Sequence, residues 1–265
     1  MFTIWSMVMT KLLVAVLTSG KPEKLARCLK SVNSNSSPHE RIVVINTTDN
    51  DYTSQATQIA FEHGFPVRVT ESNGTPGRGK NSVLEHFLST DADWLMQIDG
   101  DDYISDGCLS RIHYEIENND FDIGCLVGGH AVRPSGKIIK LNEVELLPKV
   151  IRHAMKWTKE EQEYYISYKN FIRSKTFNEE AFNRMIVYNR HAAKHRYNER
   201  LDIAEDLLYF LQARKIFSIR EINTTVEDFI YMYDFTDDGA VMESLANKTM
   251  ISNIKAMMAE YSDDE

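Results

Sequence analysis

The chain has 265 residues, of which 43% are hydrophobic and 26% are charged. A chain of this size and composition buries a sizeable core, and it is neither disordered nor of low complexity. The formal net charge is −9, but residues 133–200 contain 15 Lys and Arg against 8 Glu and no Asp, so this stretch carries +7 and the remainder −16. The basic stretch is either a solvated helical face or a surface for a polyanion.

The cysteines and the N-terminal residues bear on the compartment. Cys28, Cys108 and Cys125 show no Cys-x-x-Cys spacing, so neither a disulfide framework nor a zinc site is predicted, and a reducing cytoplasm is favoured. Residues 1–17 are mostly apolar, but Lys11 lies inside the run and no small-residue cleavage site follows, which is unlike a signal peptide. The run is also too short to span a bilayer. We expect a cytoplasmic protein without a membrane span, in the host cytoplasm if a phage encodes it.

Strand-like and helix-like segments alternate along the first hundred residues. Short apolar runs predict buried strands at residues 12–17, 41–45, 66–70 and 94–98, and helical periodicity predicts helices at 25–32, 52–63 and 83–88. This alternation predicts an α/β fold with a mostly parallel sheet flanked by helices. Ligands of such sheets gather at the carboxyl ends of the strands, so the loops after the first, second and fourth strands should meet in space.

The second half of the chain is less regular. We expect a helix at residues 105–117, a hairpin of 122–132 with 137–141, a strand at 185–190, a helix opening at Glu205, a strand at 217–225 and a final helix at 241–258 before an acidic tail. Residues 144–182 are helical only in parts. The fold prediction is therefore a parallel-sheet half joined to a mixed, partly helical half.

The strand at 94–98 ends in a cluster of three carboxylates, Asp99, Asp101 and Asp102, interrupted by Gly100. Like charges so close together are costly unless a cation lies beside them. Mg²⁺ or Mn²⁺ would relieve the repulsion, since these ions prefer carboxylate oxygens and are commonly completed by substrate phosphates. Gly100 would let the backbone approach a ligand. The alternative is an acidic surface turn, because Asp and Gly are ordinary turn residues.

Four motifs occur in a characteristic order: the turn of Thr18, Ser19 and Gly20 after the first strand, the glycine-containing loop 73–81 ending in Lys80-Asn81, the acid cluster, and the pair Glu205-Asp206. In this order they resemble the GT-A fold glycosyltransferases, specifically glycosyltransferase family 2, whose members are usually inverting. The resemblance covers residues 11–215. It implies a nucleotide-sugar-binding half at 1–105, an acceptor-binding and catalytic half at 106–230, and a C-terminal helical segment with an acidic tail at 231–265.

The resemblance also implies roles for individual residues. A nucleoside diphosphate sugar, with a UDP-sugar favoured, would give up a single sugar to a hydroxyl acceptor. Mn²⁺ or Mg²⁺ would be held by Asp101, assisted by Asp99, although Asp99 could instead face the ribose. Asp206 would be the general base that takes the acceptor's proton, with Glu205 as its partner in the site. The donor-binding residues would be Thr18, Ser19, Gly20, Asn46, Lys80, Asn81 and Asp99.

The chain departs from the family pattern at the second strand, which ends in Ile45-Asn46 and reaches Asp49 without the usual acidic residues. Asn46 or Asp49 could read the nucleobase by hydrogen bonding. The acceptor is open between a saccharide and a hydroxymethylated base in DNA, as in phage DNA modification, because the basic stretch suits a polyanion.

Two other functions fit parts of the sequence. Gly74 to Lys80 matches the P-loop pattern of a nucleotide phosphotransferase, but Asn81 stands where that motif needs a hydroxyl for magnesium. A non-catalytic nucleotide-sugar binder would keep the donor site without turnover. A sugar-nucleotide pyrophosphorylase is less consistent, since no glycine-rich loop follows the first strand directly.

Overall fold

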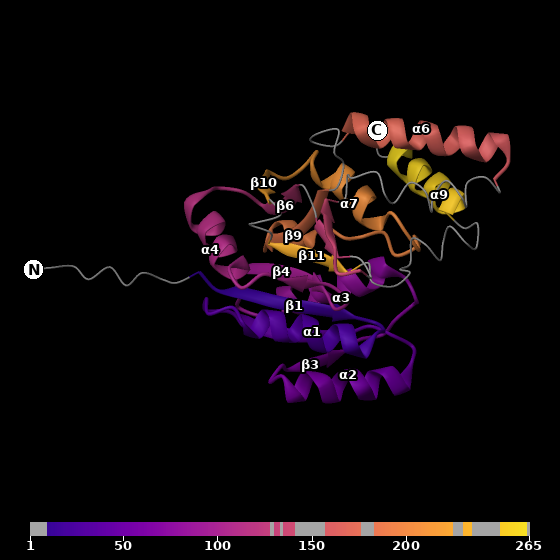
Figure 1. Ribbon diagram of the computed structural model, residues 1–265. Helices are drawn as coiled ribbons and strands as arrows, with labels where there is room; N and C mark the ends of the chain where they lie inside the picture. Colours follow the sequence, from indigo (N-terminus) through magenta and orange to yellow (C-terminus); the bar gives the residue numbers. More distant parts are fainter. Residues whose placement is uncertain are drawn as a thin grey trace, which may run out of the picture.

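The computed structural model (Figure 1) describes residues 10–127, 130–132, 135–140, 157–175, 183–224, 230–234 and 250–263. Within these ranges the chain forms a seven-stranded sheet in the order β10-β6-β9-β4-β1-β2-β3 and a four-stranded sheet in the order β5-β11-β7-β8. The larger sheet consists of β1 Leu12–Thr18, β2 Glu40–Ile45, β3 Val67–Val69, β4 Trp94–Asp99, β6 Ile123–Val127, β9 Asn183–Asn189 and β10 Ile219–Asn223. The smaller sheet consists of β5 Tyr103–Ile104, β7 His130–Val132, β8 Ile138–Lys140 and β11 Tyr231–Asp234.

Helices cover both faces of the large sheet. They are α1 Pro22–Asn33, α2 Asn50–Glu62, α3 Pro76–Leu88, α4 Cys108–Asn118, α6 Lys159–Lys175, α7 Glu205–Ala213, α9 Met250–Asp263 and the short 3₁₀ helix η2 Ala192–Lys194. The side chains of β1 alternate between two hydrophobic clusters, one shared with α1, α2 and α4 and the other with α3, α7 and α9. α6 packs on α9 at the α7 end of the molecule (Figure 1). The predicted α/β fold with helices on both faces is confirmed.

The sheet is mostly parallel, with one inserted strand of opposite direction. β1 pairs in parallel with β2 and β4, and β6 pairs in parallel with β10. β9 lies between β4 and β6 and is antiparallel to both. This places the beginning of β9 next to the end of β4, so the start of one strand contributes side chains to the edge where the other ends.

Several predicted elements differ in extent from those observed. The helix expected from residue 83 begins earlier, at Pro76, inside the glycine-containing loop, because Thr75 caps it by accepting a hydrogen bond from the Arg78 amide. The hairpin expected from 122–132 splits: β6 joins the large sheet, and only β7 pairs with β8. Residues 231–234, which the sequence places in a C-terminal helical segment, form strand β11.

Other expectations are met within the described ranges. Residues 159–175, within the tract expected to be helical in parts, form α6. The final helix is observed from Met250 to Asp263, so it continues past the expected end at residue 258 into the acidic tail. The rest of the expected helix at 241–258, residues 241–249, and most of the tract at 144–182 lie outside the described residues. All three cysteines are buried and free. None of the helices described here has the length and apolar character that a membrane crossing requires.

A buried ion pair joins α3 to α7. The Lys80 ammonium lies 2.5 Å from a carboxylate oxygen of Glu205, and both side chains are more than nine-tenths buried. Burial by itself would lower the pKa of Lys80, but the charges of Glu205 and Asp206 outweigh it and raise that pKa. Lys80 therefore stays charged and depends on its acidic neighbours.

We expect Lys80→Met and Glu205→Leu each to lower the free energy of unfolding by roughly 3–5 kcal/mol, because each leaves one buried charge without its partner. The double variant removes both charges and should lose clearly less than the sum of the two single variants. Urea unfolding followed by circular dichroism measures all three. Strictly additive losses would mean that the two groups do not stabilise one another.

Candidate active site

The ends of β1, β2 and β4 meet at one edge of the large sheet, as predicted. Thr18 is in register with Ile45, and Leu17 is in register with Asp99. The backbone continues this contact beyond the strands, since the Asn46 amide donates to the Thr18 carbonyl at 2.9 Å. Thr18, Asn46 and Asp99 consequently lie at the same edge.

Gly100 packs so closely against the end of β1 that a larger residue would not fit there. Its amide donates to the Leu17 carbonyl at 2.7 Å, and a Cβ atom added to Gly100 would lie 2.9 Å from the Thr18 Cβ. The sequence interpretation held that this glycine lets the backbone approach a ligand. The observed close approach is instead to the end of β1, and it fixes the acid cluster against the turn that follows β1.

Asp99 is neutralised by an arginine from β9. Arg184 contacts the Asp99 carboxylate at 2.6 Å, and its guanidinium lies over the rings of Tyr231 and Tyr233, 4.8 Å and 5.4 Å from their centroids. Burial would raise the pKa of Asp99, but Arg184 and Lys80 outweigh it and lower that pKa. Asp99 is therefore a partly exposed carboxylate held in its charged form by the protein's own cations.

Asp102 is a buried anchor for β11. Its two carboxylate oxygens accept hydrogen bonds from the Tyr231 hydroxyl at 2.7 Å and from the Asp234 amide at 3.0 Å. Burial, with the nearby charge of Asp101, raises the pKa of Asp102 to about 7. Tyr231 also accepts a hydrogen bond from the Asp99 amide at 3.2 Å, so β11 is tied to the acid cluster at two points.

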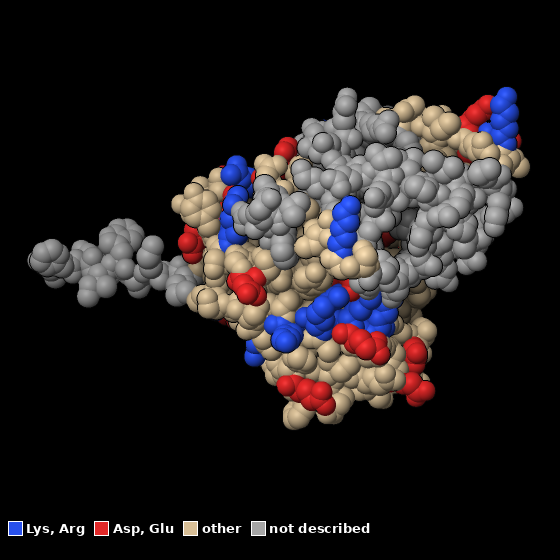
Figure 2. Space-filling model, viewed as in Figure 1, with Lys and Arg blue, Asp and Glu red and all other residues tan. Residues whose placement is uncertain are grey.

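Asp101 is the outermost carboxylate of the cluster. Its side chain is 43% exposed, and its neighbouring cation is Lys21 at 3.4 Å. Lys24 and Arg27, further along α1, pair with the buried carboxylate of Asp234. Figure 2 shows Lys and Arg side chains gathered over α1 on this face. A basic side of α1 therefore faces the carboxylates at the ends of β4 and β11.

The cluster fits a divalent cation through two of its carboxylates. Among the described residues, no group of three or more His, Cys, Asp and Glu side chains is arranged to hold a metal ion. However, Asp99 has a buried oxygen, Oδ1, without a hydrogen-bond partner, and the Asp101 carboxylate is accessible. Two oxygen ligands of this kind suit a Mg²⁺ or Mn²⁺ ion whose remaining positions are filled by water and phosphate.

The turn after β1 is shaped by an unusual backbone conformation. Thr18 is buried and its hydroxyl hydrogen-bonds that of Tyr52, whereas Ser19 is exposed. Lys21 has φ +64°, in the left-handed region that costs a residue with a side chain of order 1–3 kcal/mol. The conformation coincides with the contact between the Lys21 ammonium and Asp101. Gly20 sits in the middle of this turn, with open space where a Cβ would be.

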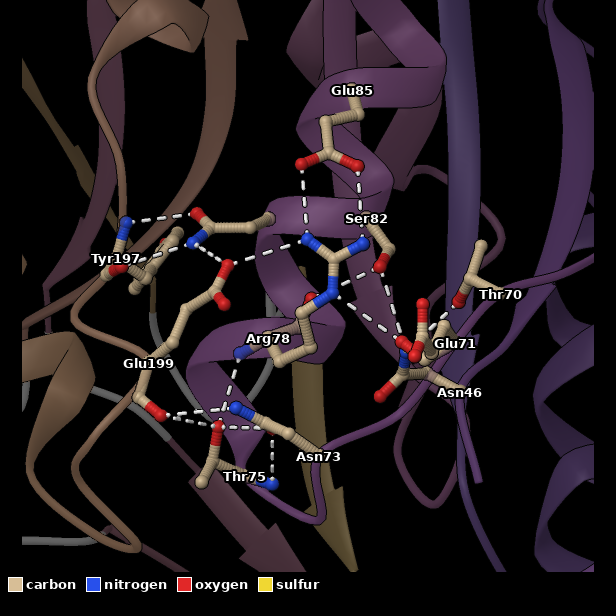
Figure 3. Close-up of polar contacts among 11 residues, drawn as sticks. Asn46, Thr70, Glu71, Asn73, Thr75, Arg78, Ser82, Glu85, Tyr197 and Glu199 are labelled. Atoms are coloured by element: carbon tan, nitrogen blue, oxygen red, sulfur yellow. Dashed lines mark hydrogen bonds and ion pairs between the residues drawn. The ribbon is translucent and has the colours of Figure 1, made fainter. Parts of the chain in front are cut away.

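Asn46 and Asp49, the candidates for reading a nucleobase, have partners within the chain. The side-chain nitrogen of Asn46, Nδ2, donates to the Thr70 hydroxyl at 2.9 Å and to the Glu71 carbonyl at 3.0 Å (Figure 3). Asp49 is the N-cap of α2, where its carboxylate accepts from two backbone amides. The side-chain nitrogen of Asn46 thus holds the end of β3 beside β2.

The two residues of the acidic pair Glu205-Asp206 lie in different environments. Glu205 is buried against Lys80, and burial raises its pKa although Lys80 opposes the shift. Asp206 is half-buried, and its carboxylate accepts a hydrogen bond from the Leu207 amide at 2.8 Å. Lys80 interacts electrostatically with Asp99 as well as with Asp206. Lys80 therefore lies between the acid cluster and the pair at the start of α7.

Asn81 faces away from the acid cluster, toward the loop before α7. Its side-chain oxygen accepts from the Tyr197 amide at 2.9 Å, and its nitrogen donates to the Tyr197 carbonyl at 3.0 Å. Both residues thus meet Tyr197. Asn81 binds its backbone, and the Lys80 ammonium, which is paired with Glu205, lies 5.2 Å from its ring centroid. The P-loop arrangement is not observed, because Lys80 is bound to Glu205 instead of facing an open glycine-rich loop.

Sequence reasoning missed the cations that balance the cluster. Arg184 lies one residue before the expected start of its strand, and only the antiparallel pairing of β9 with β4 brings it to Asp99. Tyr231 and Asp234 belong to a strand that was not predicted. A signal was present in the basic spacing Lys21, Lys24 and Arg27, which places three cations on one side of α1.

Comparisons with known proteins agree with this architecture. The family model described as "Glycosyl transferase family 2" matches residues 13–186. Among solved structures, S. aureus TarS 1-349 in complex with UDP-GlcNAc has 18% sequence identity and a TM-score of 0.58, covering 89% of this chain and 61% of that one. The same fragment in complex with UDP has 18% identity and a TM-score of 0.56, with coverages of 85% and 60%.

A third TarS structure, with 19% identity and a TM-score of 0.54, is covered by this chain over 43% of its length. The chain thus spans less than two thirds of the structures it resembles. No match was found among curated proteins. These structural likenesses confirm the predicted GT-A fold, and the family model covers well over half of the sequence. The chain therefore belongs to glycosyl transferase family 2.

Proposed function

We propose that the chain transfers a single sugar from a nucleoside diphosphate sugar to a hydroxyl group of a saccharide, with a divalent metal ion bound at Asp101 and Asp99. The observation that carries this proposal is the division of labour within the acid cluster. Both carboxylate oxygens of Asp102 accept hydrogen bonds from β11. By contrast, the Asp101 carboxylate is accessible, and Asp99 has a buried oxygen, Oδ1, without a hydrogen-bond partner. Membership of family 2 supports the reaction class.

A UDP-sugar is the favoured donor. TarS, which shares the fold, has been solved with UDP-GlcNAc and with UDP. The meeting point of β1, β2 and β4 offers the turn of Thr18, Ser19 and Gly20, together with the Asn46 region, on one side of the acid cluster. When bound, Mg²⁺ or Mn²⁺ would offset the charge of the diphosphate as the leaving group departs. Lys21 lies beside Asp101 and adds a positive charge at the same place.

Asp206 is the proposed general base. The acceptor hydroxyl must lose its proton as it attacks the anomeric carbon, so a carboxylate accessible to the acceptor is needed. Glu205 is unsuited to this role because it is buried and bound to Lys80, whereas Asp206 is half-buried at the start of α7. A single displacement with one base inverts the configuration, in keeping with the usual outcome in the family.

The basic stretch gives less support to a DNA acceptor than its charge count indicates. Arg184 and Arg190 belong to it, and both are used inside the protein. Arg184 is buried against Asp99, and Arg190 donates to the carbonyls of Thr90 and Ala92 at 2.9 Å and 3.0 Å. These charges are therefore not available to a phosphate backbone, and a saccharide is the preferred acceptor.

The proposal is tested by a screen of nucleoside diphosphate sugars for nucleotide release with Mn²⁺, using oligosaccharides and hydroxymethylated DNA as separate acceptors. We expect release from a UDP-sugar with a saccharide. Transfer to DNA, weakening steeply with salt, would instead establish the nucleic-acid acceptor. No release with any donor would contradict the proposed transfer and leave a non-catalytic nucleotide-sugar binder.

Asp206→Asn should lower kcat by roughly 100- to 10,000-fold, the usual contribution of a general base, while donor binding persists. Asp120→Asn is the matched control, since Asp120 is an exposed carboxylate outside the site. Steady-state rates of sugar transfer measure both variants. Parental activity in Asp206→Asn would remove this residue from the mechanism.

A further inference from the structure

The loop of residues 197–204 connects η2 to α7 and ends directly before Glu205 and Asp206. Its last residue, Ala204, has φ +66°, in the left-handed region that a residue with a side chain rarely adopts. Such a conformation costs of order 1–3 kcal/mol and persists where surrounding contacts impose it. The placement of Asp206 therefore depends on what holds the 197–204 loop.

The loop is bound along α3 by a set of polar contacts (Figure 3). At one end, Asn81 makes two hydrogen bonds to the backbone of Tyr197, one to its amide and one to its carbonyl. The Glu199 carbonyl accepts from Asn73 at 3.2 Å and from the Thr75 hydroxyl at 3.1 Å. Side chains at the start of α3 thus satisfy backbone groups of a loop that lies more than a hundred residues later.

The Glu199 side chain adds the charged part of this contact. One carboxylate oxygen accepts from Asn81 at 2.8 Å and from Arg78 at 3.3 Å. Arg78 is held in place from the other side by Glu85, which accepts from both of its terminal nitrogens at 3.0 Å and 3.3 Å. Glu199 is therefore the residue at which the loop is attached to a preorganised Arg-Asn pair.

Gly77 shows how closely the loop approaches the helix. A Cβ atom added to Gly77 would lie 2.2 Å from the Asn198 carbonyl oxygen, a distance at which something must shift. Glycine in a helix costs about 0.5–1 kcal/mol relative to alanine, so its presence in the first turn of α3 is explained by this contact. The close approach and the Glu199 contacts act on the same stretch of loop.

We infer that Glu199 is a positioning residue for the transfer reaction: through Arg78 and Asn81 it fixes the 197–204 loop on α3 and thereby sets the position of Asp206. This inference rests on the proposed function of Asp206. Arg78 and Asn81 then serve to place the base, while Lys80 on the same helix pairs with Glu205. One helix thus orients both the loop and the start of α7.

Glu199→Ala should lower kcat by roughly 10- to 100-fold, since a displacement of about 1 Å in a reacting group has this effect, while the donor KM changes by less than about threefold. Glu199→Gln keeps an oxygen that can accept from Asn81, so it should recover most of the lost rate. Glu117→Ala is the matched control, because Glu117 is an exposed glutamate on α4 and belongs neither to α3 nor to the loop.

A second substitution, Gly77→Ala, should displace the loop by steric contact. Gly77→Ala leaves Glu199 intact but pushes on Asn198, so its kcat should fall with the donor KM unchanged. Gly107→Ala is its control, because an added Cβ at Gly107 would meet no atom within 4 Å. Agreement between Glu199→Ala and Gly77→Ala would support an effect of loop position.

Two further readouts separate positioning from general destabilisation. In an Asp206→Asn background, Glu199→Ala should change kcat by less than about twofold, because it acts through a base that is already absent. Amide hydrogen exchange of residues 200–206 should accelerate by at least about tenfold in Glu199→Ala and stay unchanged in Asp206→Asn. The exchange measurement needs no substrate. It therefore tests whether Glu199 holds the loop independently of the proposed function.

An unchanged kcat in Glu199→Ala, or a loss that adds fully to that of Asp206→Asn, would overturn the inference. Unchanged exchange at residues 200–206 would overturn the attachment itself. If Asp206→Asn alone retained parental activity, the base assignment of the proposed function would fail, and faster exchange in Glu199→Ala would still show that this residue holds the loop.

Discussion

The structure depends on the balance of charge at the carboxyl end of β4. Three carboxylates follow one another there, and a low-dielectric environment makes their mutual repulsion expensive. Cations from other parts of the chain offset this repulsion. Arg184 enters from β9 and Lys21 from the turn after β1. The smaller sheet contributes Tyr231, whose hydroxyl donates to Asp102.

This arrangement gives the three carboxylates different properties. Asp102 is an internal hydrogen-bond acceptor with a raised pKa, and Asp99 is a partly exposed anion with a lowered pKa. Asp101 remains at the surface of the cluster. Sequence proximity alone would treat them as equivalent. The surroundings make Asp102 a structural acceptor, keep Asp99 charged beside Arg184, and leave Asp101 accessible from outside the protein.

α3 links the acid cluster to the second half of the site. Lys80 lies on the same helix as Arg78 and Asn81. It interacts with Asp99, Glu205 and Asp206, and its ammonium lies 5.2 Å from the ring centroid of Tyr197, at the start of the 197–204 loop. The helix therefore provides a rigid element between the donor side, where β1, β2 and β4 end, and the start of α7. Rigid elements hold reactive groups more accurately than loops do, which suits a reaction between two substrates.

Much of this was predictable from sequence, because it rests on local patterns. The strands at β1, β2 and β4 are short apolar runs, and their alternation with helices sets the parallel sheet and the edge at which Thr18, Asn46 and Asp99 meet. The acid cluster and the Glu205-Asp206 pair were recognisable from residue type and order. Their partners were not. Arg184 reaches Asp99 only through the antiparallel insertion of β9, and Glu199 reaches Asn81 across 118 residues of sequence.

Binding of Mn²⁺, followed by electron paramagnetic resonance, tests the central claim most directly. We expect the protein to bind Mn²⁺ tightly when UDP is present. Asp101→Asn should abolish this binding, whereas Asp120→Asn, a change at an exposed carboxylate outside the cluster, should leave it intact. Equal Mn²⁺ binding by Asp101→Asn and the parent, or binding that does not depend on the nucleotide, would contradict it.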